Sequence, residues 1–210
     1  WALAAALVTA GCGAALGGDS AGSGDGDTLV LGISRQLTSL DPGSSGSIDG
    51  DATVQGALFS SLTRIDPEQK LVGDLATSWR QDSPTRWTFT LREGVKFSNG
   101  DPLDANTVKW NFERLLDPDT KLTSAPAIRA IVESVEAPDP HTVVINTKRP
   151  YLGLDERLAT LNFTQQQWVE THNPALEPLG TGPYQLESVD LENGATLVRN
   201  PHYYGPEPAY

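Results

Sequence analysis

The strongest constraint on the fold is a change of hydrophobic period between residues 87 and 116. Trp87, Phe89 and Leu91 alternate with polar residues, which is typical of a strand that buries one face. After a short turn sequence, Asp104 stands where a carboxylate can accept hydrogen bonds from the first N–H groups of a helix. The helix itself is predicted by apolar residues at helical spacing, which are Val108, Phe112, Leu115 and Leu116. A strand and a helix separated by one turn indicate a mixed α/β fold.

Short elements of both kinds are predicted along the rest of the chain. A helix is expected from Asp51 onward because its apolar residues form one stripe, at Val54, Ala57, Leu58 and Leu62. The composition and period predict a short helix at 165–172 and strands at 28–33, 132–137, 142–147, 184–189 and 195–199. Asn193-Gly194 between the last two strands is a strong hairpin signal. An indole supplies a large buried area, so three tryptophans are assigned to the core, namely Trp79, Trp87 and Trp110.

Composition limits the partners that this chain can have. The formal net charge of the 210 residues is -12, so the basic surface that nucleic acid requires is missing and nucleic acid is not expected as a partner. The single cysteine, Cys12, leaves no pair for a disulfide and no Cys-based zinc site within the sequence. The lack of Met and of clustered His disfavours direct metal ligation. We therefore predict no metal site and no cofactor.

No motif in the sequence predicts catalysis. His141, His172 and His202 stand far apart, and none belongs to an HExxH pattern. A Gly-x-Ser-x-Gly elbow and a glycine-rich phosphate loop are also missing from the sequence. A hydrolase with paired carboxylates remains an alternative, but only the abundance of Asp and Glu supports it. We predict that the chain is not an enzyme and has no catalytic residue.

The first residues indicate export and a lipid anchor. Residues 1–11 are an apolar run ending in small residues, which is typical of the end of a secretory signal peptide. The sequence does not begin with Met, so we interpret residues 1–11 as a signal-peptide remnant. Val8 to Cys12 resembles a bacterial lipobox, and residues 12–27 read as a lipidated flexible tether of Gly, Ala, Ser and Asp. Acyl chains on Cys12 are expected to hold the protein on the membrane without a spanning helix.

Several segments carry a family likeness in order and spacing. The longest segments are 75–79, 87–103 and 108–118, and the shorter ones are Ser39-Leu40-Asp41-Pro42, Ser60 to Arg64, Gly180 to Tyr184 and Asn200 to Gly205. Together they resemble the signature of family 5 extracellular solute-binding proteins, the dipeptide, oligopeptide and nickel type binding proteins of bacterial ABC importers. The likeness is specific because no single short motif carries it.

The resemblance implies a periplasmic-binding-protein-like, two-lobed fold of type II (cluster C) that closes over a solute. We expect only the N-terminal lobe and an inserted domain to be present, with the opposing lobe beyond Tyr210. On this basis residues 28–46 are the first segment of lobe domain I, residues 47–161 are inserted domain II, and residues 162–210 return to domain I. Strands that would complete the last sheet are then missing, so we expect the chain alone to fold poorly.

The resemblance also places the candidate site residues. Two loops are expected to line the solute cleft, through Ser45, Gly46 and Ser47 in the first and Thr123 and Ser124 in the second. The alternative is that each loop is only a solvated turn. Relatives that bind longer peptides can carry an acidic residue near Gly46, and its absence here argues against pairing with a peptide amine. A structural crossover near the hinge is expected at Gly180, Thr181, Gly182, Pro183 and Tyr184.

The function implied by the resemblance is delivery of a small solute to ABC permease subunits, outside the cytoplasm. A peptide is the expected cargo, and nickel chelate, an oligosaccharide or an opine-like molecule are the alternatives within import. A solute-sensing, chaperone-like or adhesive lipoprotein of the same fold is the alternative outside import, because a shared scaffold does not fix the function.

Overall fold

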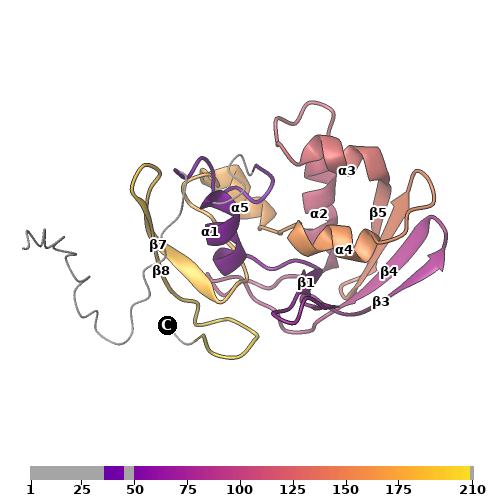
Figure 1. Ribbon diagram of the computed structural model, residues 1–210, viewed down its shortest axis with the longest axis horizontal. Coiled ribbons are helices and arrows are strands. Elements are labelled where there is room, and N and C mark those ends of the chain that lie inside the picture. The colour runs from indigo at the N-terminus through magenta and orange to yellow at the C-terminus, as the bar shows by residue number, and fades with distance from the viewer. Residues whose placement is uncertain (1–35, 45–49, 209–210) are drawn as a thin grey trace, which may run out of the picture. The chain divides into compact units, whose positions relative to one another are not determined.

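The computed structural model describes residues 36–44 and 50–208, so Cys12 and the strand predicted at 28–33 lie outside the described residues (Figure 1). The helices are α1 (Gly50–Leu58), α2 (Ala105–Leu116), α3 (Ala125–Ile131), α4 (Leu154–Arg157), the 3-10 helix η1 (Leu158–Thr160) and α5 (Gln166–Thr171). The strands are β1 (Thr63–Ile65), β2 (Leu71–Gly73), β3 (Ala76–Ser83), β4 (Arg86–Leu91), β5 (Val132–Asp139), β6 (Thr142–Thr147), β7 (Tyr184–Asp190) and β8 (Gly194–Arg199). The mixed α/β class predicted from the hydrophobic periods is confirmed.

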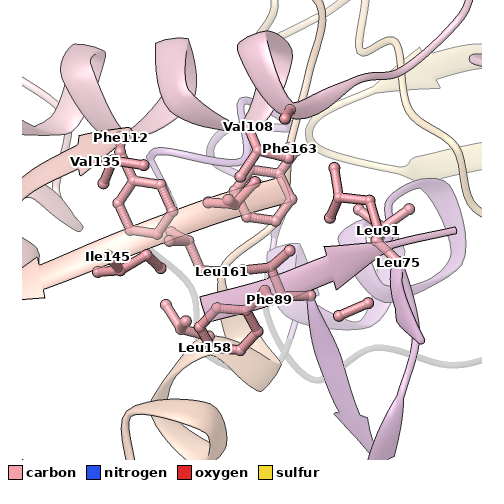
Figure 2. Packing of buried hydrophobic residues seen from close by; sticks show 14 of the residues in the cluster. Leu75, Phe89, Leu91, Val108, Phe112, Val135, Ile145, Leu158, Leu161 and Phe163 are labelled. Carbon is pink, nitrogen blue, oxygen red and sulfur yellow. The ribbon is translucent and has the colours of Figure 1, made fainter. Parts of the chain in front are cut away.

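The largest sheet is antiparallel with strand order β3-β4-β6-β5. Phe89 of β4 lies opposite Val143 of β6, and Trp87 lies opposite Ile145, so these side chains share the face that alternation predicted. Helix α2 packs against β5 and α3, as Figure 1 shows. Figure 2 shows the side chain of Phe112 pointing from α2 toward the strands, within one cluster of buried apolar residues.

Helix α2 begins and ends where the sequence predicted. The Asp104 carboxylate accepts a hydrogen bond from the Thr107 N–H at 2.9 Å, which confirms the predicted N-cap. Asp117 is the C-cap, and Pro118 follows it. Of the predicted apolar stripe, Leu116 is only half-buried, while the others lie in the core.

A second hydrophobic cluster joins α1 to the β7–β8 hairpin. Its buried members are Leu37, Leu40, Val54, Leu58 and Phe59, and the apolar residues of the hairpin pack against them. The predicted hairpin is confirmed, with Asp190 opposite Gly194. The stripe predicted for the first helix was wrong at its end, because α1 stops at Leu58 and Leu62 belongs to the cluster of the large sheet.

Two further sequence predictions need correction. Trp110 was assigned to the core, but it is half-buried and is not among the side chains packed against the core cluster. The reason is its position on α2. Trp110 is two residues after the buried Val108, which at 100° per residue is about 200° around the helix axis, so the two side chains lie on opposite sides of the helix. Trp79 is also only half-buried, although it packs against the cluster, and its indole N–H donates to the Asp155 carboxylate at 2.9 Å. None of the described helices is long and apolar enough to cross a membrane.

Candidate functional site

Gly43, in the segment that leads into Ser45, Gly46 and Ser47, contacts the second predicted loop at Ser124, 81 positions further along the chain. The Ser124 N–H donates to the Gly43 carbonyl oxygen at 3.2 Å. A Cβ at Gly43 would lie 2.8 Å from a methyl carbon of Leu122, so the second loop packs directly on the first. Ser45, Gly46 and Ser47 lie outside the described residues, directly after this contact. We refer below to residues 39–44 and 122–126 as the loop pair.

An ion pair fixes the first loop to helix α2. The Arg114 guanidinium donates to both carboxylate oxygens of Asp41, at 2.9 and 2.5 Å. The Asp41 carboxylate also accepts a hydrogen bond from the Gly43 N–H at 2.9 Å, which holds the turn. The side chains are 18% exposed for Arg114 and 7% exposed for Asp41, so little water competes for this contact. Bidentate geometry fixes orientation as well as distance.

Helix α1 holds the same loop from another side. The Gln55 side-chain amide donates to the carbonyl oxygens of Ser39 and Asp41, at 3.2 and 3.1 Å. The Asp51 carboxylate accepts hydrogen bonds from the N–H and the hydroxyl of Thr38. Asp51 and Gln55 are both buried. The described part of the loop is therefore pre-formed, as a binding surface requires.

The side chains around the loop pair differ in exposure. Thr123 is exposed, and Ser124 is half-buried at the start of α3 without a side-chain cap hydrogen bond. The Arg114 guanidinium lies 5.7 Å from the centroid of the half-buried Trp110 ring. This surface presents hydroxyls, peptide groups and an indole.

Sequence reasoning missed the residues that build the loop pair. Asp41 stands in the Leu40-Asp41-Pro42 segment, which local turn chemistry explains without any partner. Arg114 sits on a helix whose apolar stripe does not predict a buried cation. The available signal was that Asp41 and Arg114 both lie in segments that resemble the family. This resemblance does not predict that the two side chains are in contact.

The crossover segment packs against the end of α1. A Cβ at Gly180 would lie 2.0 Å from the Leu58 carbonyl oxygen, and a Cβ at Gly182 would lie 2.6 Å from that of Ala57. The Gly182 N–H donates to the Leu58 carbonyl oxygen at 2.9 Å, so glycine is needed for a close backbone approach. Thr181 is fully buried. Its hydroxyl has no hydrogen-bond partner within the residues described.

The rest of the crossover leads into the hairpin. The Pro183 carbonyl oxygen accepts a hydrogen bond from the Asn200 N–H at 2.9 Å, and Tyr184 is the first residue of β7. The Asn200 amide also donates to the Gly182 carbonyl oxygen at 2.8 Å. These contacts explain why the segment is tight; its role near a hinge stays a prediction.

Across residues 36–44 and 50–208, no group of three or more His, Cys, Asp or Glu side chains is arranged to hold a metal ion.

Comparison with known proteins gives a consistent result. Residues 70–210 match the model of bacterial extracellular solute-binding proteins, family 5 middle region. The chain is 32% identical over 201 residues to the probable D,D-dipeptide-binding periplasmic protein DdpA of Escherichia coli K12, covering 88% of this chain and 38% of that protein.

Solved structures show the same fold. The structure of NikZ from Campylobacter jejuni in complex with Ni(L-His) superposes with a TM-score of 0.77 and 27% identity, over 87% of this chain and 37% of that one. The Escherichia coli murein tripeptide binding protein MppA gives a TM-score of 0.75 and 26% identity, over 82% and 38% of the two chains.

The chain thus spans a little over a third of the length of these proteins. The predicted periplasmic-binding-protein fold is confirmed by these neighbours. Since the family model covers residues 70–210 and most of the chain superposes on solved members, this chain belongs to the bacterial extracellular solute-binding proteins of family 5.

Proposed function

We propose that this chain is part of an extracytoplasmic solute-binding protein that captures a small solute and delivers it to the permease of an ABC transporter. Membership of the solute-binding family supports this proposal. A binding role also agrees with a sequence that contains no catalytic motif. A peptide is the preferred cargo, since DdpA and MppA are named as binders of a D,D-dipeptide and a murein tripeptide.

The observation that carries the proposal is the direct contact between the loop pair. The hydrogen bond from Ser124 to Gly43 joins the second predicted cleft loop to the segment that leads directly into the first. The anchored residues 39–44 lead straight into Ser45, Gly46 and Ser47, which we propose as solute contacts together with Thr123 and Ser124. A pre-formed wall lowers the conformational entropy lost on binding, so it favours affinity. Gly180 to Tyr184 is proposed as the crossover beside the hinge on which the lobes close.

The experiment is a thermal-shift screen of the full-length, unlipidated protein against di- to octapeptides, nickel chelates, oligosaccharides and opine-like molecules. A ligand selective for the folded state raises the melting temperature in a concentration-dependent way. Ser124→Trp should abolish or reduce the shift, because an indole would fill the space beside Gly43. Ser78→Trp, at an exposed position of β3, is the control and should bind as the parent does.

The outcomes separate the candidate functions. A shift with peptides supports peptide import, and a shift only with Ni(L-His) changes the cargo but keeps the import role. If no class of small solute shifts the melting temperature, solute delivery is refuted and a chaperone-like lipoprotein is favoured. Equal binding by the parent and Ser124→Trp would remove Ser124 from the site.

We also propose the lipid anchor at Cys12. Support comes from the sequence alone, since an apolar run and small residues precede the cysteine and a Gly-rich tether follows it. Cys12→Ser in the full-length precursor should release the protein from the membrane fraction and abolish labelling by a fatty-acid analogue. Retention of the label in Cys12→Ser would exclude this site.

A further inference from the structure

A polar cavity is lined by residues that belong to neither segment of the loop pair. Its volume is about 230 Å³, and its lining includes Arg64 of β1, Asp74, Arg92, Tyr203 and Tyr204. Arg64 lies in β1, Asp74 and Arg92 directly follow β2 and β4, and the two tyrosines follow β8. Two guanidinium groups therefore line one cavity beside one carboxylate, in a chain whose formal net charge is -12.

The carboxylate of Asp74 is already engaged within the protein. One oxygen accepts a hydrogen bond from the Tyr204 hydroxyl at 2.5 Å, and the other accepts from the Ser61 N–H at 3.0 Å. Burial raises the pKa of Asp74, while both arginines oppose that change through their charge. The two guanidinium groups thus lie within electrostatic reach of Asp74, but neither forms an ion pair with a carboxylate within 4.0 Å in the described part of the chain.

Most donors of the two arginines have no hydrogen-bond partner among the described residues. Arg92 lies over the Tyr204 ring, 5.2 Å from its centroid, and its Nε donates to the Asp74 carbonyl oxygen at 3.4 Å. Arg64 is exposed, and its side chain has no hydrogen bond to a described residue. The Tyr203 hydroxyl stays protonated at neutral pH, because burial and the charge of Asp74 raise its pKa. The Tyr203 hydroxyl can therefore donate a hydrogen bond to a ligand in the cavity.

We propose that this cavity binds a small free carboxylate, through the guanidinium groups of Arg64 and Arg92 and the hydroxyl of Tyr203. The planar guanidinium fork matches a carboxylate in bidentate fashion. Two cations beside one carboxylate leave a net positive wall, which suits a monovalent anion. A cation is disfavoured, because the guanidinium groups of Arg64 and Arg92 would repel it. The volume leaves room for about eight water-sized groups, at about 30 Å³ each, which is ample for a small carboxylate.

The test is a calorimetric titration of the full-length protein with sodium acetate at neutral pH, with sodium chloride holding the ionic strength constant. Saturable binding is expected. Arg64→Ala should weaken it about tenfold or more, as loss of a charge-assisted pair implies. Tyr203→Phe should weaken it by a smaller factor. Arg80→Ala is the control, because Arg80 is an exposed arginine of β3 that pairs with Asp82 away from the cavity.

Arg64 is exposed and has no side-chain hydrogen bond to a described residue, so Arg64→Ala should keep the fold, which circular dichroism checks. Absence of saturable binding to the parent protein would overturn the proposal, and so would unchanged acetate affinity in Arg64→Ala. Binding lost equally in Arg80→Ala would show an unspecific charge effect and would also overturn it. The solute screen on the same samples is independent, because acetate binding here does not rest on the proposed transport function.

Discussion

The Asp41–Arg114 pair gives the sharpest test of how the loop pair is held. Arg114→Met keeps a long apolar stem and removes the charge, which leaves the Asp41 carboxylate, only 7% exposed, without its cation. Breaking a buried pair in this way costs on the order of 3–5 kcal/mol. We expect a loss of about 3 kcal/mol in the free energy of unfolding, at the lower end of this range. The reason is that Asp41 keeps its hydrogen bond from the Gly43 N–H and that the Arg114 side chain is 18% exposed.

A double-mutant cycle separates the pair from the individual side chains. Asp41→Asn removes the charge that Arg114→Met leaves unpaired. The double variant should therefore lose less free energy of unfolding than the two single variants lose together. The expected coupling is about 2 kcal/mol, within the range for residues in contact. The assay is urea unfolding of the full-length protein, followed by tryptophan fluorescence and circular dichroism to test whether the transition is two-state.

Arg80→Met is the matched control, because the Arg80 side chain is 68% exposed and surface pairs of this kind contribute little. We expect no resolved change in its unfolding midpoint. The reasoning is refuted if Arg114→Met shifts the midpoint no further than Arg80→Met does. It is also refuted if the double variant loses as much free energy of unfolding as the two single variants together, since the Asp41–Arg114 contact would then contribute nothing of its own.

Three further predictions concern the surrounding structure. Gly180→Ala should destabilise the protein by about 3 kcal/mol or more, because its Cβ would lie 2.0 Å from the Leu58 carbonyl oxygen. The control is Gly56→Ala on α1, where a Cβ has open space, and this variant should be more stable than the parent by about 1 kcal/mol. Equal melting temperatures for the two variants would contradict this prediction. Burial raises the pKa of Asp74 above 3.8, so the stability linked to its protonation is present below pH 3.8 and is lost as pH rises through the raised value. Asp74→Asn should therefore gain stability relative to the parent across that rise, and a pH-independent difference in urea midpoints would disprove the assignment. Asp104→Ala should cost about 1 kcal/mol through loss of the α2 N-cap, with Asp104→Asn as the conservative control in thermal unfolding.

Local sequence patterns were sufficient for elements whose causes are local. The N-cap at Asp104 and the alternation at Trp87 and Phe89 involve residues within a few positions of one another, and the structure confirms them. Helix α3 was missed because it has only seven residues, begins with Ala125-Pro126 and sits in a segment interpreted as a loop. A helix this short depends on tertiary packing more than on propensity, so its sequence carries little signal.

Contacts between distant segments could not be predicted in the same way. Arg114 and Asp41 are 73 residues apart, and each has a sufficient local explanation as a helix residue or a turn residue. Trp110 shows the same limit, because its aromatic character suggested the core while its helical phase placed it on the side facing away from Phe112. Residue type and local period predict what an element is, but not which distant side chain it meets.

These distant contacts also build the proposed site. The loop that leads to the proposed solute contacts is held by Gln55 from α1, by Arg114 from α2 and by the Ser124 N–H. A solute that binds to such a loop does not have to order residues 39–44, so more of its interaction energy remains as affinity. If residues 45–47 contact the solute as proposed, their variation changes which solute is recognised and leaves the contacts of residues 39–44 unchanged. This division agrees with a family whose solved relatives share the fold while their names describe different ligands.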